Sequence, residues 1–256
     1  MLIVIGLLLS AFAVALVNAP ASLVPLAIAE MEKQGTLQHG VPSLVLAETS
    51  GTVWNGKALE AILTIDGIDV PLGILEWQLK PMSLLVSEPE IVFTTDAPGQ
   101  VLKATVTANA QGHIKVSAME GRLPISVLEP WFPLLVRGDI AFVVDHLFFS
   151  ASTLNSIDGM LNFEYVDWMG GDYDMPLGSY TAQIYNEDQK VLVKVDDFSA
   201  RLGINGLMTV NPDGLYTFKA TLQPRSGLAA EVAESVAWLG KKQTNGDVLI
   251  TTRGRL

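Results

Sequence analysis

The three carboxylates Asp167, Asp172 and Asp174 are the residues whose types and spacing best suit a chemical function. They lie within eight residues on a glycine-rich segment and could supply the oxygen ligands that calcium prefers. The segment lacks the regularly spaced Asp and Asn residues and the closing Glu of an EF-hand loop. We therefore interpret it as a solvated hairpin connection, and we expect neither a bound metal nor a cofactor.

Other residues that could catalyse a reaction are scattered. His39, His113 and His146 stand in unrelated contexts, and no Gly-x-Ser-x-Gly motif supplies a nucleophile. Neither a P-loop nor a Gly-x-Gly-x-x-Gly fingerprint occurs, which gives nucleotide binding no support. The chain has no Cys, so thiolate nucleophiles and Cys-ligated metal sites are excluded. Paired carboxylates for glycoside hydrolysis stay open, but no spacing singles out a pair. We do not expect an enzyme.

The net charge of −11 also limits the partners, because an acidic chain repels a phosphate backbone. We find no stripe of Lys and Arg that would offset this repulsion locally, so we expect no nucleic-acid binding. The 43 charged side chains are unevenly distributed, since none precedes Glu30. The chain therefore divides into an uncharged beginning and an acidic body.

The uncharged beginning predicts a membrane helix. Residues 2–17 contain eleven Leu, Ile, Val and Phe, each of which favours the bilayer centre by about 0.3–0.6 kcal/mol. The span could extend through Ala19 to Leu26, giving lipid contact through residues 2–26. A signal peptide cleaved after Val17-Asn18-Ala19 is the alternative, although Pro20 disfavours that cut. The acidic flank at residues 30–33 places the body outside the cytoplasm and the N-terminus inside.

The body alternates apolar and polar residues with a period of two, which predicts strands with one buried face. Examples are Leu102/Ala104/Val106, Ile114/Val116, Val191/Val193/Val195 and Tyr216/Phe218/Ala220. Asn-Gly or Asp-Gly pairs, which suit tight hairpins, occur at residues 55–56, 66–67, 158–159, 205–206, 213–214 and 245–246. We expect a mainly β fold: a single N-terminal transmembrane helix followed by a long, curved antiparallel β meander.

Two short helical segments are expected within this body. Residues 228–239 have an amphipathic pattern, with Ser226 as a possible N-cap and Gly240-Lys241-Lys242 at the C-terminal end. An apolar piece at Ile125–Glu129 lies between two prolines, which keep it short. The predicted organisation is an anchor at 1–28, a membrane-proximal helix or linker at 29–47, and a β domain at 48–256.

Two motifs go beyond general β patterning. Gly51-Thr-Val-Trp54-Asn55-Gly56 is followed by Leu72-Gly73 and then by Trp77 before Pro81. With the later Leu177-Gly178-Ser-Tyr180 and Asp213-Gly214-Leu-Tyr216 segments, these residues resemble protein N of the bacterial type II secretion system. The motif residues carried over are Gly51, Thr52, Trp54, Asn55, Gly56, Gly73, Trp77 and Pro81. We expect a type I′ turn at Asn55-Gly56 and favour a fold-defining role for the motif over a partner contact.

The resemblance implies a non-enzymatic accessory protein of the inner membrane, with one span, a cytoplasmic N-terminus and a periplasmic β domain. Its expected partners are inner-membrane and periplasmic proteins of the secretion machine, which it would contact through an open sheet edge or an exposed face. The alternative is a lipid-handling role, because AsmA-like bridge proteins also follow a membrane helix with β meanders. That alternative depends on analogy of fold alone.

Overall fold

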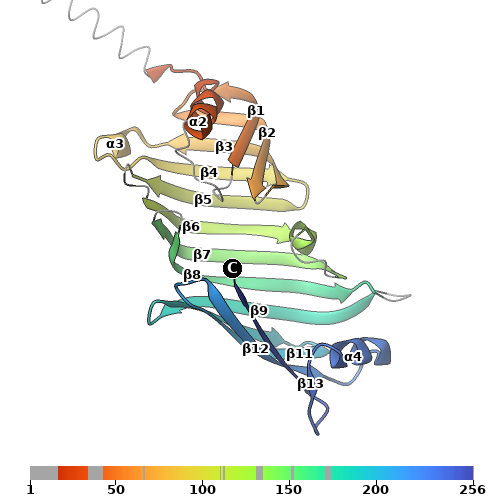
Figure 1. Cartoon of the computed structure of the whole chain (residues 1–256). Helices are drawn as coiled ribbons and strands as arrows, with labels where there is room; N and C mark the ends of the chain where they lie inside the picture. Colours follow the sequence, from red (N-terminus) through yellow and green to blue (C-terminus); the bar gives the residue numbers. More distant parts are fainter. Residues whose placement is uncertain are drawn as a thin grey trace, which may run out of the picture. The chain divides into compact units, whose positions relative to one another are not determined.

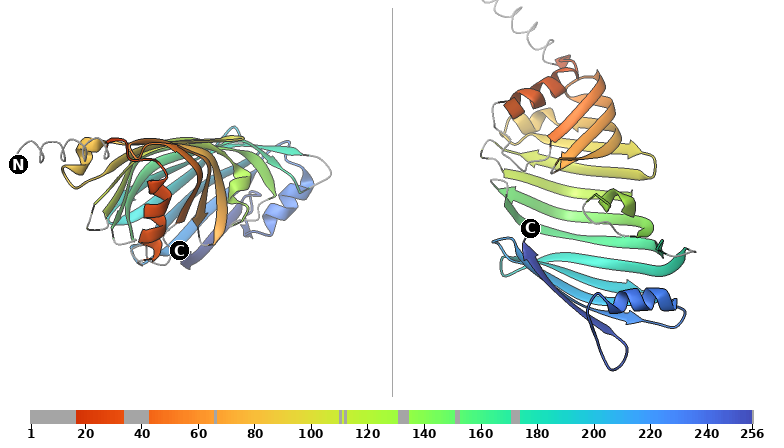
Figure 2. Two further views of the ribbon diagram at one scale, coloured as in Figure 1. Left: turned by 90° about the horizontal axis from the view of Figure 1, so that it is seen from above. Right: turned by 45° about the vertical axis from the view of Figure 1, so that its right-hand side comes forward.

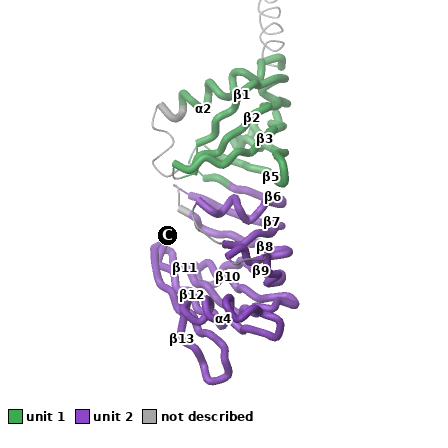
Figure 3. The backbone as a smooth tube through the Cα atoms, turned by 90° about the vertical axis from the view of Figure 1, so that its right-hand side faces the viewer, with its two compact units in different colours: residues 1–114 green, residues 115–256 purple. Residues whose placement is uncertain are grey.

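The computed structural model describes residues 17–33, 43–65, 67–109, 111, 113–130, 135–150, 153–170 and 174–255. Most of the predicted membrane segment, His39 and Asp172 lie outside these residues. Within them, no helix is both long enough and apolar enough to cross a membrane. The chain forms two compact units, residues 1–114 and residues 115–256 (Figure 3).

Unit 1 is an antiparallel sheet in which each strand pairs with the next along the chain (Figure 1). Its elements are α2 (Leu23–Lys33), β1 (Ser43–Gly51), β2 (Asn55–Ile65), β3 (Ile68–Leu79), α3 (Pro81–Leu84), β4 (Glu90–Ala97) and β5 (Gln100–Ala108). Its core is formed by three alanines, two leucines and one tryptophan: Ala21, Leu46, Ala58, Ala61, Leu75 and Trp77. Val24 and Ile28 of α2 pack against this cluster.

Unit 2 contains most of β6 and all later elements, with strand order β6-β7-β8-β9-β10-β11-β12-β14-β13. The elements are β6 (His113–Pro124), η1 (Ile125–Leu128), β7 (Val136–Ser150), β8 (Thr153–Trp168), β9 (Met175–Glu187), β10 (Lys190–Phe198), β11 (Leu202–Val210), β12 (Leu215–Pro224), α4 (Ala230–Ala237), β13 (Lys241–Lys242) and β14 (Val248–Arg255). The predicted antiparallel β meander is confirmed.

The core of unit 2 consists of branched aliphatic side chains. Leu177, Leu222 and Val248 from the sheet form one cluster with Val232 and Val236 of α4. Figure 2 shows α4 beside the last strands of this unit, whereas α2 lies beside the first strands of unit 1. Each helix therefore covers part of one face of its own sheet.

Only three of the six Asx-Gly pairs lie at hairpin turns. Gly67, Gly214 and Gly246 have φ of +78°, +80° and +94° and connect β2 to β3, β11 to β12 and β13 to β14. The turns expected at 158–159 and 205–206 are wrong, because these pairs lie inside β8 and β11. There the missing side chain allows close packing: a Cβ on Gly159 would lie 2.6 Å from the carbonyl oxygen of Val143.

Both expected helical segments exist, but their ends differ from the prediction. The helix expected at 228–239 is limited to α4, and its N-cap is Ala229, with no side-chain hydrogen bond. Ser226 is therefore not the cap. Lys241 and Lys242 form β13 rather than a helix end, because they pair with Leu249 and Val248. The piece at Ile125–Glu129 is a 3₁₀ turn, η1, whose Ile125 is buried.

Candidate interaction site

The motif beginning at Gly51 forms the connection between β1 and β2. Gly51 pairs with Gly56, and the Thr52 amide donates to the Asn55 carbonyl oxygen over 2.8 Å. The Asn55 amide donates to Thr52 Oγ1 over 3.1 Å. The expected two-residue turn at Asn55-Gly56 is wrong, because both residues already belong to β2. The left-handed φ, +88°, is at Gly51 instead.

Gly56 is required by Trp77 rather than by a turn. The two residues are cross-strand partners, and the Trp77 ring lies directly over the glycine. A Cβ on Gly56 would lie 2.2 Å from Cζ2 of that ring. The indole Nε1–H donates to the Val53 carbonyl oxygen over 3.0 Å, and Trp77 is only 8% exposed. One side chain thus joins β3 to Val53 and Gly56 of the motif, as expected for a fold-defining residue.

The same loop holds the residues that follow the uncharged N-terminal stretch. The Val53 amide donates to the Ala19 carbonyl oxygen over 2.9 Å, and the Ala21 amide donates to the Gly51 carbonyl oxygen over 3.1 Å. Pro20 forms an isolated antiparallel bridge with Thr52. Residues 19–21 are therefore attached to the sheet by main-chain bonds, and Ala21 is buried. These residues, predicted as the end of the anchor, pack with the sheet.

The remaining motif residues shape β3. Gly73 lies at a bulge where both it and Ile74 oppose Asp96, and its φ is +69°. A Cβ there would lie 2.4 Å from the Asp96 carbonyl oxygen, so only glycine fits. Pro81 begins α3 directly after β3, where its missing N–H costs no helical bond. The structure thus brings Gly51, Thr52, Trp54, Asn55, Gly56 and Trp77 together, whereas Gly73 lies at a bulge earlier in β3 and Pro81 begins α3.

A shallow, open hollow of about 460 Å³ lies over this region of unit 1. Lys57, Glu76, Gln78 and Thr94 contribute to its lining, and Lys57 Nζ lies 2.9 Å from Glu76 Oε1. These groups can form hydrogen bonds with a partner.

Two of the three carboxylates that suggested calcium, Asp167 and Asp174, form ion pairs with one arginine. Arg137 lies 2.7 Å from Asp174 and 3.5 Å from Asp167, and these hydrogen bonds raise its pKa, with Asp174 contributing most. Among the residues described, no group of three or more potential ligands could hold a metal ion. Of the histidines, His113 lies 3.3 Å from the side chain of Asn109, and His146 lies within β7.

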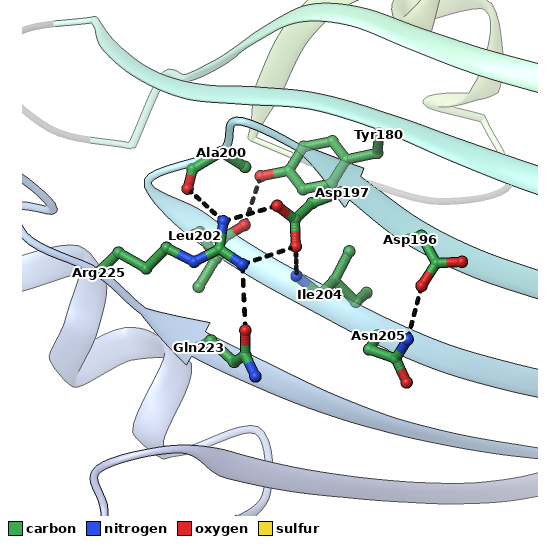
Figure 4. A network of polar contacts seen from close by, with 9 residues as sticks. All are labelled: Tyr180, Asp196, Asp197, Ala200, Leu202, Ile204, Asn205, Gln223 and Arg225. Atoms are coloured by element: carbon green, nitrogen blue, oxygen red, sulfur yellow. Dashed lines mark hydrogen bonds and ion pairs between the residues drawn. The ribbon is translucent and has the colours of Figure 1, made fainter.

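An ion pair in unit 2 is the polar feature that the sequence did not predict (Figure 4). Both terminal nitrogens of Arg225 donate to the carboxylate of Asp197, over 2.6 and 3.1 Å, and Arg225 also donates to Ala200 and Gln223. The Asp197 side chain is 9% exposed. Burial, the largest single effect, raises the pKa of Asp197. Hydrogen bonds from Arg225 and two main-chain amides outweigh it and lower the pKa below its ordinary value.

Tyr180 completes this network. Its hydroxyl donates to the Leu202 carbonyl oxygen over 3.0 Å. Burial, together with the negative charge of Asp197, raises the pKa of Tyr180 to about 12. The network spans β9 to β12. We interpret it as a structural clamp between four strands.

The last strand, β14, has an open edge. On one side it pairs with β12 along its full length, whereas β13 pairs only with its first two residues, Val248 and Leu249. Among the residues described, no strand lies beside Ile250–Arg255 on that side. The Gln243 amide donates to the Asp247 carbonyl oxygen over 2.7 Å, so the main-chain groups of Asp247 face β13.

The residues four, six and eight positions beyond Asp247 point their main-chain groups the same way, because direction alternates along a strand. The N–H and C=O groups of Thr251, Arg253 and Arg255 therefore face the open edge. The register with β12 is uniform, so no bulge interrupts this alternation. We define these three residues as the open edge of β14.

The comparisons with known proteins agree on one family. A family model described as "Type II secretion system (T2SS), protein N" matches residues 42–251. Two curated proteins named "Type II secretion system protein N" are similar. That of Klebsiella pneumoniae is 27% identical, covering 95% of this chain and 92% of its own, and that of Aeromonas hydrophila is 26% identical, covering 84% and 86%.

A third protein of the same name, from Vibrio cholerae, is 22% identical and covers 83% of this chain and 85% of its own. No solved structure is significantly similar to the chain. The family match includes the motif at residues 51–56, Trp77 and the open edge up to Thr251. The chain belongs to the type II secretion system protein N family.

Proposed function

We propose that this protein is a non-enzymatic inner-membrane component of the type II secretion system. Residues 2–17 anchor it, its N-terminus is cytoplasmic, and its β body binds other secretion proteins in the periplasm. The family membership supports the secretion role. The anchor is shortened from the expected 1–28 because Ala21, Val24 and Ile28 pack on the sheet of unit 1. The β domain then begins near residue 19 rather than at residue 48.

The open edge of β14 is the observation that carries the binding role. No described strand pairs with the N–H and C=O groups of Thr251, Arg253 and Arg255 on this side, so they form a template for an added strand. A partner segment that pairs there satisfies these groups and extends the sheet. Thr251, Thr252, Arg253 and Arg255 are all exposed, so their side chains leave the edge accessible.

The charge around this edge indicates an acidic partner segment. Residues 215–255 contain six Lys and Arg against three Asp and Glu, in a chain whose net charge is −11. Lys241, Lys242, Arg253 and Arg255 take part in none of the ion pairs found in the described part of the chain. Two copies of β14 side by side would bring like charges together, which disfavours self-pairing.

An exposed tryptophan adds an apolar contact next to the edge. Trp238 is 90% exposed and ends α4, three residues before Lys241, which pairs with Leu249. Tryptophan is among the residues that contribute most to protein interfaces. An extended acidic segment with one large apolar side chain fits this combination of edge, charge and ring.

The substitution Arg253→Pro tests the role of the edge. Proline removes the N–H that faces the open edge, while the bonds between β14 and β12 are retained. We expect exoprotein secretion to fall strongly when this variant replaces the wild type in cells, with the protein level unchanged. Arg253→Gln, the matched control, keeps the N–H and removes only the charge, so its loss should be smaller.

Thr252→Pro, whose N–H faces β12, should instead lower the melting temperature and the protein level. Photo-crosslinkers placed at Thr251 should trap a type II secretion protein, and Arg253→Pro should abolish this product. If deletion of the gene leaves secretion and the composition of the purified machine unchanged, the proposed function is wrong. Lipid that co-purifies with the extracted protein would favour the lipid-handling alternative.

A further inference from the structure

The connection between β3 and β4 exposes a run of apolar side chains. Met82, Leu84, Leu85 and Val86 are 73%, 42%, 76% and 69% exposed, and α3 contains no buried residue. Among the residues described, no other stretch of five includes four exposed large apolar side chains. We call residues 82–86 the apolar loop. Figure 1 shows α3 at the β3–β4 connection, projecting beyond the ends of the strands.

Hydrogen bonds fix the main-chain conformation of this loop. Ser83 Oγ donates to the Lys80 carbonyl oxygen over 2.6 Å and accepts from the Glu90 amide over 2.9 Å. The amides of Leu85, Ser87 and Glu88 donate to carbonyl oxygens within the turn. Lys80 and Glu90 form an ion pair at its base. The hydrogen bonds thus hold the main chain of the loop in place. The apolar side chains point to solvent, where they do not stabilise the fold.

The base of the loop is close to the place where the anchor joins the sheet. The Leu79 amide, two residues before Pro81, donates to the Trp54 carbonyl oxygen over 2.8 Å. Val53, next to Trp54, donates to Ala19 over 2.9 Å. Only Asn18 separates Ala19 from the uncharged run of residues 2–17. Because no linker intervenes, a bilayer that holds this run also lies next to this end of unit 1.

A second apolar surface follows the same point. Leu23 and Leu26 of α2 are 46% and 65% exposed, although Val24 and Ile28 of the same helix pack on the sheet. The helix thus has apolar residues on the side that the sheet does not cover. Leu23 lies four residues after Ala19, and Met82 lies three residues after Leu79, whose amide donates to Trp54 beside Val53. Both exposed surfaces thus begin near the β1–β2 connection.

We propose that the apolar loop inserts into the interface of the membrane that residues 2–17 anchor. This inference rests on the anchor of the proposed function. The occupant is the boundary between lipid headgroups and acyl chains, which removes the side chains of Met82, Leu85 and Val86 from water. A single helix leaves a domain free to rotate about the membrane normal, whereas a second contact fixes which face of unit 1 meets the bilayer.

The chain is well suited to a test by site-specific labelling, because it contains no Cys. An environment-sensitive fluorophore is attached to Leu85→Cys in the full chain, reconstituted in vesicles of phosphatidylethanolamine and phosphatidylglycerol. We expect brominated lipids to quench this label several-fold more than a label at Phe198→Cys, and aqueous iodide to quench it less. Phe198 and Leu85 are both 76% exposed in the described structure, which makes Phe198 the matched control.

A label at Leu9→Cys reports on the anchor itself and separates the two proposals. If lipid quenches Leu9 but not Leu85, the apolar loop does not enter the membrane and the anchor stands. If lipid quenches neither position, the anchor is wrong, and the inference that rests on it fails as well. Equal quenching at Leu85 and Phe198 would indicate general adsorption and would also overturn the inference.

A charged substitution provides the second measurement. With the label at Met82→Cys, adding Val86→Asp should reduce lipid quenching, because a carboxylate resists entry into the acyl region. Val86 is 69% exposed, so the melting temperature should stay unchanged. Val86→Ala, the matched control, should retain most of the quenching. Unchanged quenching in the Asp variant would contradict insertion of the loop.

Discussion

Unit 1 and unit 2 are both antiparallel sheets, but they are held together differently. The core of unit 1 combines the small residues Ala21, Ala58 and Ala61 with one large ring, Trp77. That of unit 2 uses branched aliphatic residues beneath α4, together with the partly buried ion pair of Asp197 and Arg225. Small side chains let the backbone approach closely. This is what unit 1 needs, because residues 19–21 lie directly on its first hairpin.

The difference shows that stability depends on shape in unit 1 and more on charge in unit 2. In unit 1 the ring of Trp77 fits only because residue 56 has no side chain. In unit 2, Arg225 joins Asp197 to the ends of neighbouring strands through several hydrogen bonds. A change of volume should therefore affect unit 1 most, and a change of pH should affect unit 2 most.

The substitution Trp77→Ala should cause the largest loss. Removing a buried tryptophan typically costs about 3–5 kcal/mol, and here the hydrogen bond to Val53 is lost as well. Urea unfolding followed by circular dichroism measures this loss. Trp238→Ala, which removes a ring that is 90% exposed, is the control and should leave the free energy of unfolding nearly unchanged. Equal losses for the two variants would contradict the role of Trp77.

Arg225→Ala should produce the next largest effect, by leaving the carboxylate of Asp197 without its ionic partner. We expect a clear fall in the free energy of unfolding, smaller than for a fully buried pair, because Arg225 is 41% exposed. Arg225→Lys should retain only part of the stability that Arg225 provides, because lysine cannot bind the carboxylate with two nitrogens.

The pH dependence checks the same pair. The pKa of Asp197 is lowered in the folded state, so its contribution is present above the unfolded pKa of about 4 and disappears as the pH falls below it. Asp197→Asn should therefore reduce the fall in melting temperature as the pH drops below about 4. If the melting temperature of this variant falls as steeply as that of the wild type, the pair does not stabilise unit 2.

Gly56→Ala should destabilise unit 1 by about 1–3 kcal/mol, because the added Cβ would lie 2.2 Å from the Trp77 ring. The double variant with Trp77→Ala tests this cause. Once the ring is absent, the alanine at position 56 should cost less, and the remaining loss reflects the Thr52 carbonyl oxygen, 2.8 Å from the added Cβ. Additive losses in the double variant would instead indicate that this carbonyl oxygen, and not the ring, is the main obstacle to the alanine.

Tyr180→Phe should have a smaller effect at neutral pH, about 1 kcal/mol, through loss of the hydrogen bond to Leu202. The folded pKa of Tyr180 is raised to about 12 from an ordinary value of 10. Its stabilising contribution is thus complete below pH 10 and declines as the pH rises toward 12. Melting temperatures measured across this range should fall more steeply for the wild type than for the phenylalanine variant.

Lys57→Ala should have the smallest effect, below about 1 kcal/mol, because Lys57 and Glu76 are exposed and water screens their pairing. Adding salt should reduce even this difference. A loss comparable to that of Arg225→Ala would overturn the view that unit 1 depends on shape.

Much of the fold follows from local patterns, but close packing does not. Alternation along residues 191–195 and 216–220 correctly predicts β10 and β12, and Gly214 and Gly246 correctly mark turns. The same dipeptide predicted turns wrongly at Gly159 and Gly206. The sequence alone does not distinguish a glycine needed for close packing of two strands from one needed for a positive φ.

The candidate site divides in the same way. The motif at residues 51–56 and Trp77 were predicted to define the fold, whereas the bond from Val53 to Ala19 joins residues 34 positions apart. Asp197 and Arg225 are separated by 28 positions, so only the register of β10, β11 and β12 reveals their contact. The open edge of β14 depends on how short β13 is, and nothing in residues 241–242 predicts that length.

The attachment of residues 19–21 also bears on proteolytic processing. A protease that cuts between Ala19 and Pro20 needs the chain extended and free on both sides of that bond. In the folded protein Ala19 and Ala21 are hydrogen-bonded to the first hairpin, and Pro20 bridges to Thr52. Cleavage after folding would require these residues to detach first, and it would leave the Val53 amide without its acceptor. Folding of unit 1 thus protects the junction between the N-terminal segment and the β body.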